Sequence, residues 1–226
     1  NLKYMRTARA IIAGLAIAAS AGLAPICSAQ TISTLVNINT TWKYEQSGTD
    51  LGTTWRNVGF NDATWQSGPG ILQGGETTAY PFPFGTTINP PGGKTCNYFR
   101  TTFQGPSTTN GIFVYATNFV DDACVIWLNG VEAGRIRMPA GTPTYATLAS
   151  GGPGTEGQMD VITINPTLLR PNQQNTLAVE VHQPDLTSSD VVWGTRIVAY
   201  IPSALTITNQ PDSLSAVAGE SVTFSV

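Results

Sequence analysis

Residues 121–132 constrain the fold of this chain more than any other segment. A run of strand-forming residues at 124–128 ends at Asn129-Gly130, and a second run that mixes polar and apolar residues follows. Asn-Gly readily adopts the positive φ angles of a tight turn, so the segment predicts a β-hairpin. The hairpin indicates an all-β context, but it does not indicate a reaction.

The rest of the chain after residue 30 reads as strands and turns with little helix. Segments rich in β-branched and aromatic residues are separated by short, turn-rich gaps, which favours an antiparallel sandwich over a parallel α/β sheet. Residues 47–75 read as loop. Residues 165–169 are the best helix candidate, of one or two turns, because Asn165 can cap it and Pro166 suits its first position. The expected strands cover residues 42–44, 98–103, 112–118, 124–128, 131–136, 159–164, 176–183 and 191–200.

The charge of the chain excludes one class of partner. Its formal net charge is −3, and only 11% of its residues are charged, against about 25% in an average soluble domain. No basic patch is present that would neutralise phosphates, so we expect no nucleic-acid partner. No apolar run after the N-terminal region is long enough to cross a bilayer.

The N-terminal segment 1–29 has the pattern of a signal peptide. Arg6 and Arg9 precede an apolar core at residues 10–23, and small residues at 27–29 precede the expected cut before Gln30. We therefore expect a secreted protein, extracellular or on the cell surface. A transmembrane anchor and a lipid anchor on the cysteine of the cut site are the alternatives.

Residues 202–226 predict a linker followed by the start of another domain. Two short apolar runs joined by a glycine turn resemble the first strands of an immunoglobulin-like domain. This segment is too short to bury a core of its own. We therefore expect a fragment of a longer multidomain protein, with a terminal hairpin that packs on the main domain as the alternative.

Two cysteines, Cys96 and Cys124, remain after removal of the signal peptide. Export to an oxidising compartment makes a disulfide between them possible, and closing that loop would contribute about 3–4 kcal/mol in the chain-entropy model. The alternative is two separate buried thiols, because Cys124 shares a strand face with Ile126 and Leu128.

Several motifs occur in a characteristic order between residues 42 and 200. Together they resemble the galactose-binding-like jelly-roll modules of large exported bacterial proteins. The Leu-Asn-Gly hairpin and the strand at 177–181 are also similar to the N-terminal sandwich domain of family 2 glycoside hydrolases. The resemblance implies a jelly-roll β-sandwich over residues 30–201. The motifs are Trp55, Asn61-Asp62, Trp65, Tyr98-Phe99-Arg100, Asp121-Asp122, Leu128-Asn129-Gly130, Met138-Pro139, residues 177–183 and Ser188-Ser189-Asp190.

The chain departs from the family pattern at three places. Ala123 stands where glycine usually follows the paired aspartates, Trp127 stands where tyrosine is common, and Trp193-Gly194 replaces Phe-Asp. These changes leave the expected fold intact. They weaken the argument for assigning the ligand-binding residues of the family to positions in this chain.

Asp121 and Asp122 are the candidate metal ligands. Adjacent strand residues point to opposite faces, so the two carboxylates are not expected to face one substrate together. One of them can join backbone carbonyls around calcium, which prefers oxygen ligands, and the resemblance implies a structural calcium. The alternative is that both shape the turn before the strand.

Glu180 and His182 share one strand face and predict a structural polar network that holds the loop carrying Ser188, Ser189 and Asp190. A single histidine cannot form a multi-histidine metal site. General-base catalysis by His182 would need a positioned partner. We therefore expect no catalytic residues in this segment and no required cofactor.

The loop residues Tyr80, Phe82 and Phe84 are the candidate carbohydrate-binding residues. They alternate with prolines, which stiffen the loop and lower the entropy lost on binding. Their rings can stack on the apolar faces of sugars. The alternative is that the rings fold back and plug one end of the sandwich.

The expected function is a non-catalytic carbohydrate-recognition or interaction module of a secreted multidomain protein. Its expected partners are a carbohydrate or cell-surface glycan and further domains of the same chain. One alternative is an accessory domain of an exported glycoside hydrolase or phosphoesterase whose catalytic domain lies beyond Val226. Another is a structural spacer in a surface protein.

Overall fold

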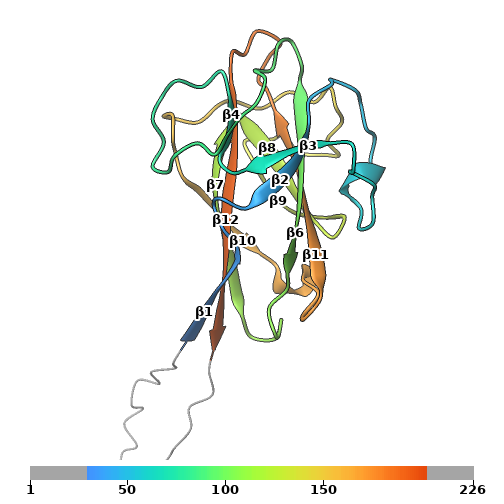
Figure 1. Ribbon diagram of the computed structural model, residues 1–226, viewed down its shortest axis with the longest axis vertical. Coiled ribbons are helices and arrows are strands. Elements are labelled where there is room, and N and C mark those ends of the chain that lie inside the picture. Colours follow the sequence, from blue (N-terminus) through green and yellow to red (C-terminus); the bar gives the residue numbers. More distant parts are fainter. Residues whose placement is uncertain (1–29, 203–226) are drawn as a thin grey trace, which may run out of the picture.

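The chain forms two six-stranded sheets packed face to face (Figure 1). The computed structural model describes residues 30–202. The expected signal peptide at 1–29 lies outside the described residues, as does nearly all of the expected immunoglobulin-like start at 202–226. No helix between residues 30 and 202 has both the length and the apolar character needed to span a membrane.

All paired strands run antiparallel except β4 and β5, which confirms the expected antiparallel sandwich. The first sheet has the order β10 (Asp160–Ile164), β7 (Phe113–Asp121), β12 (Val191–Pro202), β4 (Leu72–Gly74) and β5 (Thr86–Thr87), with β1 (Gln30–Val36) paired to β12. The second has the order β3 (Gln66–Pro69), β2 (Thr41–Glu45), β6 (Cys96–Gln104), β11 (Gln174–His182), β8 (Ala123–Leu128) and β9 (Val131–Ile136).

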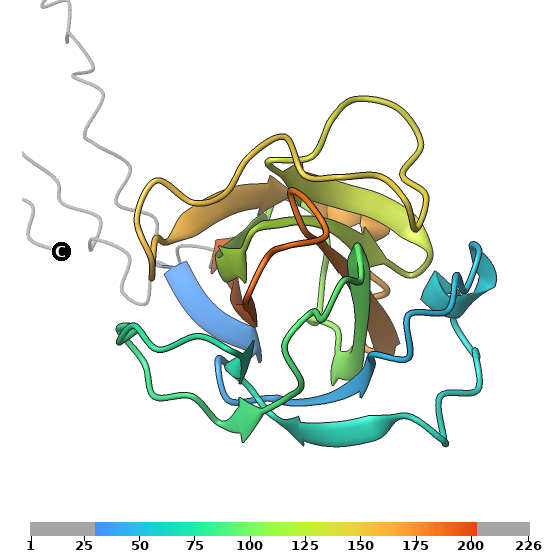
Figure 2. The same ribbon diagram turned by 90° about the horizontal axis from the view of Figure 1, so that it is seen from above.

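The alternation of side chains along each strand separates an inner face from an outer face. On β11, Val179 and Val181 join the core between the sheets, whereas Ala178 belongs to a second apolar cluster on the outer face. Trp42 and Trp193 meet edge to face at the centre of the core, with ring centroids 5.5 Å apart. The two sheets enclose this core, and long connections surround them (Figure 2).

The hairpin predicted from Asn129-Gly130 is confirmed. Asn129 has φ 53° and Gly130 has φ 86°, and the turn joins β8 to β9. Two successive positive φ angles match the right-handed twist of the flanking strands. The helix expected at 165–169 is a single 3-10 turn, η2 (Pro166–Leu168), which begins where the Asn165 side chain accepts a hydrogen bond from the Thr167 amide.

The expectation that residues 47–75 are loop is wrong in part. The segment contains the 3-10 turn η1 (Thr54–Arg56) and the short strands β3 and β4. β3 pairs with β2, and β4 pairs with β12. These strands have three or four residues and little alternation of polarity, so their pairing partners, rather than a local pattern, define them.

Candidate functional site

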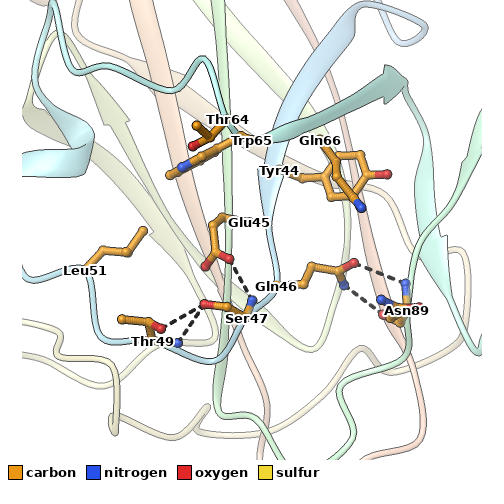
Figure 3. Close-up of a pocket in the computed structure, with 10 residues that line it drawn as sticks. All are labelled: Tyr44, Glu45, Gln46, Ser47, Thr49, Leu51, Thr64, Trp65, Gln66 and Asn89. Atoms are coloured by element: carbon orange, nitrogen blue, oxygen red, sulfur yellow. Dashed lines mark hydrogen bonds between the residues drawn. The ribbon is translucent and has the colours of Figure 1, made fainter.

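A groove of about 460 Å³ lies beyond the end of β2 (Figure 3). It combines two aromatic side chains with a carboxylate, amides and hydroxyls. Its lining residues are Tyr44, Glu45, Gln46, Ser47, Thr49, Leu51, Thr64, Trp65, Gln66 and Asn89.

Hydrogen bonds within the lining hold its polar groups in place. Glu45 Oε1 accepts from the Ser47 amide at 2.7 Å, and the Ser47 hydroxyl donates to Thr49 at 2.9 Å. On the other side, the Gln46 side chain donates to the Asn89 carbonyl at 2.8 Å and accepts from the Asn89 amide at 3.1 Å (Figure 3). The groove is therefore formed before any ligand binds.

One oxygen of the groove lacks a partner. Glu45 Oε2 is buried and makes no hydrogen bond. A buried acceptor without a donor costs about 1–3 kcal/mol. Because this oxygen is closed to solvent, a ligand hydroxyl or amine would reach it only if the side chain turned toward the groove. The lining can bind a polyhydroxylated ligand through its carboxylate, amides and hydroxyls, with Tyr44 and Trp65 as its aromatic side chains.

The sequence did not indicate this groove. Its residues come from the end of β2, the following loop, the start of β3 and the segment after β5. All five tryptophans of the chain are buried, so Trp65 gives no sign in the sequence of lining a groove. The one sequence signal for the groove is Glu45 at the end of a strand, followed by Gln46 and Ser47. The same pattern occurs in many loops, so it does not indicate a binding site.

The aromatic loop folds back onto the outer face of the first sheet. The Tyr80 and Phe84 rings pack together with centroids 5.1 Å apart, and both are half-buried. Tyr80 and Phe82 contact Phe119 edge to face. Phe82 remains 42% exposed. The rings therefore cover a sheet face rather than plug an end of the sandwich, and Phe82 alone of the three is open to solvent.

Asp121 and Asp122 lie among other carboxylates where β7 ends. One carboxylate oxygen from each of Glu76, Asp121 and Glu156 lies within 4.8 Å of the other two. The Tyr80 hydroxyl donates to Glu156 at 3.2 Å. The guanidinium of Arg137 contacts this aspartate pair, and its Nε donates to the Asp122 carbonyl at 2.6 Å.

This concentration of negative charge shifts the titration of both aspartates. Burial, followed by the charges of Asp122 and Asp190, raises the pKa of Asp121 to about 8. Burial also raises the pKa of Asp122. Asp121 is only 3% exposed, so a proton or a cation is needed near neutral pH to offset its charge.

The structure divides the expected polar network into two parts. His182 Nδ1 lies 2.7 Å from the Thr147 carbonyl, and Glu180 Oε1 accepts from Trp127 Nε1 at 2.9 Å. Neither of these hydrogen bonds reaches the loop that carries Ser188 and Asp190.

That loop is held instead through the aspartate pair. The Ser188 hydroxyl lies 3.5 Å from Asp122 Oδ2 and from the Asp190 carbonyl, and Ser189 donates to Asp190 at 3.2 Å. Gln183, with its amide nitrogen turned toward these acceptors, donates to Asp122 Oδ2 at 2.9 Å. These hydrogen bonds therefore place Ser188 and Asp190 in one group and Glu180 and His182 in another, and a single network of all four residues stays a prediction.

The structure contains free thiols in place of the possible disulfide. Cys96 and Cys124 are both buried and unbonded. Cys124 points into the core and Cys96 belongs to the cluster on the outer face. Strand β11 lies between their strands, and the two cysteines belong to apolar clusters on opposite faces of this sheet.

Comparison with known proteins gives structural matches only. No family model matches the chain, and no curated protein matches it. The fold is similar to a calcium-binding mutant of β-glucuronidase 2 from Bacteroides uniformis, with a TM-score of 0.48 and 14% identity over 77% of this chain. It is also similar to a β-glucuronidase from Ruminococcus gnavus, with a TM-score of 0.47 and 12% identity over 76% of this chain.

The chain spans only a small part of these enzymes. It covers 18% of the Bacteroides protein and 29% of the Ruminococcus protein. A β-glucuronidase from glycoside hydrolase family 2 matches at a TM-score of 0.45, with 15% identity over 76% of this chain and 18% of the enzyme. The likeness is one of fold.

Proposed function

We propose that this chain carries a non-catalytic, galactose-binding-like module that recognises carbohydrate in the groove beside Glu45. The observation that carries the proposal is a preformed groove lined by Glu45, Trp65, amides and hydroxyls. Sugar hydroxyls donate to carboxylates and amides, and a hydrogen bond to a charged group contributes about 1.5–3 kcal/mol.

The charge of the groove restricts the class of sugar. Glu45 is the only charged residue in its lining. A sugar with a carboxylate would place a second negative charge close to this side chain, so neutral or amine-bearing sugars are the proposed ligands.

Glycan-array binding followed by titration calorimetry tests the proposal. Glu45→Gln keeps the size of the side chain and removes its charge, and we expect it to weaken binding by about 10- to 100-fold. Phe82→Ala on the aromatic loop is the matched control and should leave affinity unchanged. Loss of binding in Phe82→Ala alone would move the site to the aromatic loop. No binding by the unmodified protein would remove the carbohydrate proposal.

A structural calcium is proposed at the carboxylates around Asp121. The supporting observation is the set of three carboxylate oxygens within 4.8 Å of one another, with Asp121 almost fully buried. Calcium binds through oxygen ligands. In this position it would join the end of β7 to the loops that carry Glu76 and Glu156, and it would serve the fold rather than a reaction.

The proposed absence of catalysis applies to this segment. Asp121 has a raised pKa, as a general acid does, but its 3% exposure leaves no room for a sugar ring against the carboxyl. Hydrolysis of aryl glycosides or aryl phosphates by the purified chain would contradict this proposal.

A second candidate function is contact with neighbouring domains. Phe113 and Tyr115 are 55% and 37% exposed on β7, and they line a hollow of about 340 Å³ with Gln30 and Tyr200. Gln30 and Tyr200 belong to the paired strands β1 and β12, and β12 lies beside β7 in the first sheet (Figure 1). Exposed apolar patches commonly mark interfaces. The module would then serve as an accessory domain of a larger enzyme or as a spacer between other domains.

A further inference from the structure

A second group of ligand-type side chains lies on the outer face of the second sheet. Cys96 on β6 and His182 on β11 are directly opposed cross-strand partners. Glu180 lies two residues before His182 and therefore on the same face. One ligand atom from each of the three lies within 4.8 Å of the other two. All three side chains are buried, with His182 at 0% exposure.

The hydrogen bonds around His182 fix which of its nitrogens faces this cluster. Nδ1 lies 2.7 Å from the Thr147 carbonyl, which can only accept, so Nδ1 carries the hydrogen and donates it. In the neutral ring, Nε2 then bears a lone pair. Nε2 is buried without a hydrogen-bond partner and lies 3.4 Å from Glu180 Oε2. A lone pair and a carboxylate oxygen at this distance repel unless a positive charge lies between them.

The other two groups present electron pairs to the same place. Glu180 is held through Oε1 by Trp127 Nε1 at 2.9 Å, which leaves Oε2 to face His182. The Cys96 sulfur donates weakly to the Asn97 carbonyl at 3.7 Å. Metal ligands are commonly oriented in this way, with the outer nitrogen of a histidine on a carbonyl and a carboxylate held by a donor.

We propose that Cys96, Glu180 and His182 bind a zinc ion. Sulfur, imidazole nitrogen and carboxylate oxygen are all zinc ligands, and the mixed set suits this borderline metal better than calcium or magnesium. On binding, the Cys96 S–H bond breaks, its proton leaves to solvent, and the thiolate sulfur bonds to Zn²⁺. Three side chains supply three of the four positions that zinc prefers, and a water molecule is the simplest fourth ligand.

Zn²⁺ would offset the negative charge of the Glu180 carboxylate, which is buried in this cluster. It would also connect β6 to β11 and, through His182, to the loop that contains Thr147. Because the cluster is enclosed, the ion must enter during folding or local opening, so the binding free energy adds to folding.

The test is metal uptake by the full chain refolded with zinc chloride, followed by metal analysis after gel filtration. We expect one zinc per chain. Refolding with Co²⁺ should give a thiolate-to-cobalt absorption band in the near ultraviolet. Cys96→Ser should abolish this band, and Cys124→Ser is the matched control because it alters the other buried cysteine on the opposite face of the sheet.

Folded wild-type protein that takes up no stoichiometric zinc would overturn the proposal, whatever the behaviour of the variants. Uptake of copper without zinc would overturn it as well, as would a cobalt band that persists in Cys96→Ser. Far-ultraviolet circular dichroism establishes that each sample is folded. If the metal is bound as proposed, a chelator during refolding lowers the Tm of the wild type and of Cys124→Ser, and leaves the Tm of Cys96→Ser unchanged.

Discussion

The side-chain amide of Asn129 donates a hydrogen bond to Oδ1 of Asn175 at 2.8 Å. The same nitrogen donates to the Leu168 carbonyl, and Asn129 Oδ1 accepts from the Thr176 amide at 3.0 Å. The turn residue therefore holds its own hairpin against the start of β11. Asn175 is fully buried and also binds the backbone of Arg170, so one amide pair organises two connections at this end of the sandwich.

Asn129→Gly should destabilise the fold by about 2 kcal/mol, because three hydrogen bonds are lost, each with a net contribution of about 0.5–1.5 kcal/mol. Asn172→Gly is the control, since Asn172 has φ 54° and Asn129 has φ 53°, and it removes one exposed side-chain hydrogen bond, to the Ser107 carbonyl. Glycine adopts a positive φ angle without steric strain, so the backbone effect of the substitution is the same at both sites. Urea unfolding of the two variants provides the measurement. Equal effects would show that the side chain of Asn129 contributes nothing beyond its turn.

Asp121→Asn should remove a pH dependence of stability. The folded pKa of Asp121 is about 8, against about 3.9 for a free side chain. The folded state therefore binds the proton more tightly, and this stabilisation is complete below about pH 4 and is lost as pH rises through about 8. Without added metal, the Tm of the wild type should fall relative to that of Asp121→Asn between pH 5 and 8. Parallel Tm profiles would contradict the assignment.

Calcium should stabilise the wild type at pH 8. Binding at 100 times the Kd adds about 2.7 kcal/mol, and Glu156→Gln should weaken the response because it removes one of the clustered oxygens. Glu132→Gln, which removes a carboxylate paired with Arg135, is the control. Thermal unfolding with calcium or magnesium is the measurement. The same stabilisation by magnesium, or an unchanged response in Glu156→Gln, would refute a selective calcium site there.

Gly194→Ala should destabilise the centre of the first sheet by about 1–3 kcal/mol through overpacking. A Cβ at Gly194 would lie 2.7 Å from Ile71 Cγ1 and 3.1 Å from Ile71 Cγ2. In the Ile71→Ala background, Gly194→Ala should destabilise the fold less than it does in the wild type, because both γ carbons of Ile71 are removed. In the Ile71→Val background, which retains two γ carbons, the cost of Gly194→Ala should not fall. Strictly additive effects in the Ile71→Ala pair would disprove the contact.

The elements that the sequence predicted are those with a local signal. The β8–β9 hairpin follows from the backbone preference of Asn129-Gly130, and the capped turn at 166–168 follows from Asn165 and its proline. Strand β3 has the sequence QSGP, which carries no alternation, and only its pairing with β2 makes it a strand. Local patterns do not contain this information.

The candidate sites depended on contacts that are distant in sequence. Alternation correctly placed Glu180 and His182 on one face, but the partner of His182 comes from Thr147, in a loop without a regular pattern. The groove likewise needs Asn89 beside Gln46. The order of strands was also required to see that β11 separates Cys96 from Cys124. Sequence reasoning therefore identified chemically capable residues more successfully than it identified their partners.

The antiparallel pairing of β1 with β12 has a mechanical consequence. Gln30 is opposite Pro202, and the register continues inward to Val36 opposite Ile197. Tension applied to the chain at residues 30 and 202 therefore pulls on the outermost pair alone, and the strands peel apart one pair at a time rather than sliding past each other. If the module lies in a tethered surface protein, β1 would detach at low force and lengthen the connection while the remaining strands keep their shape.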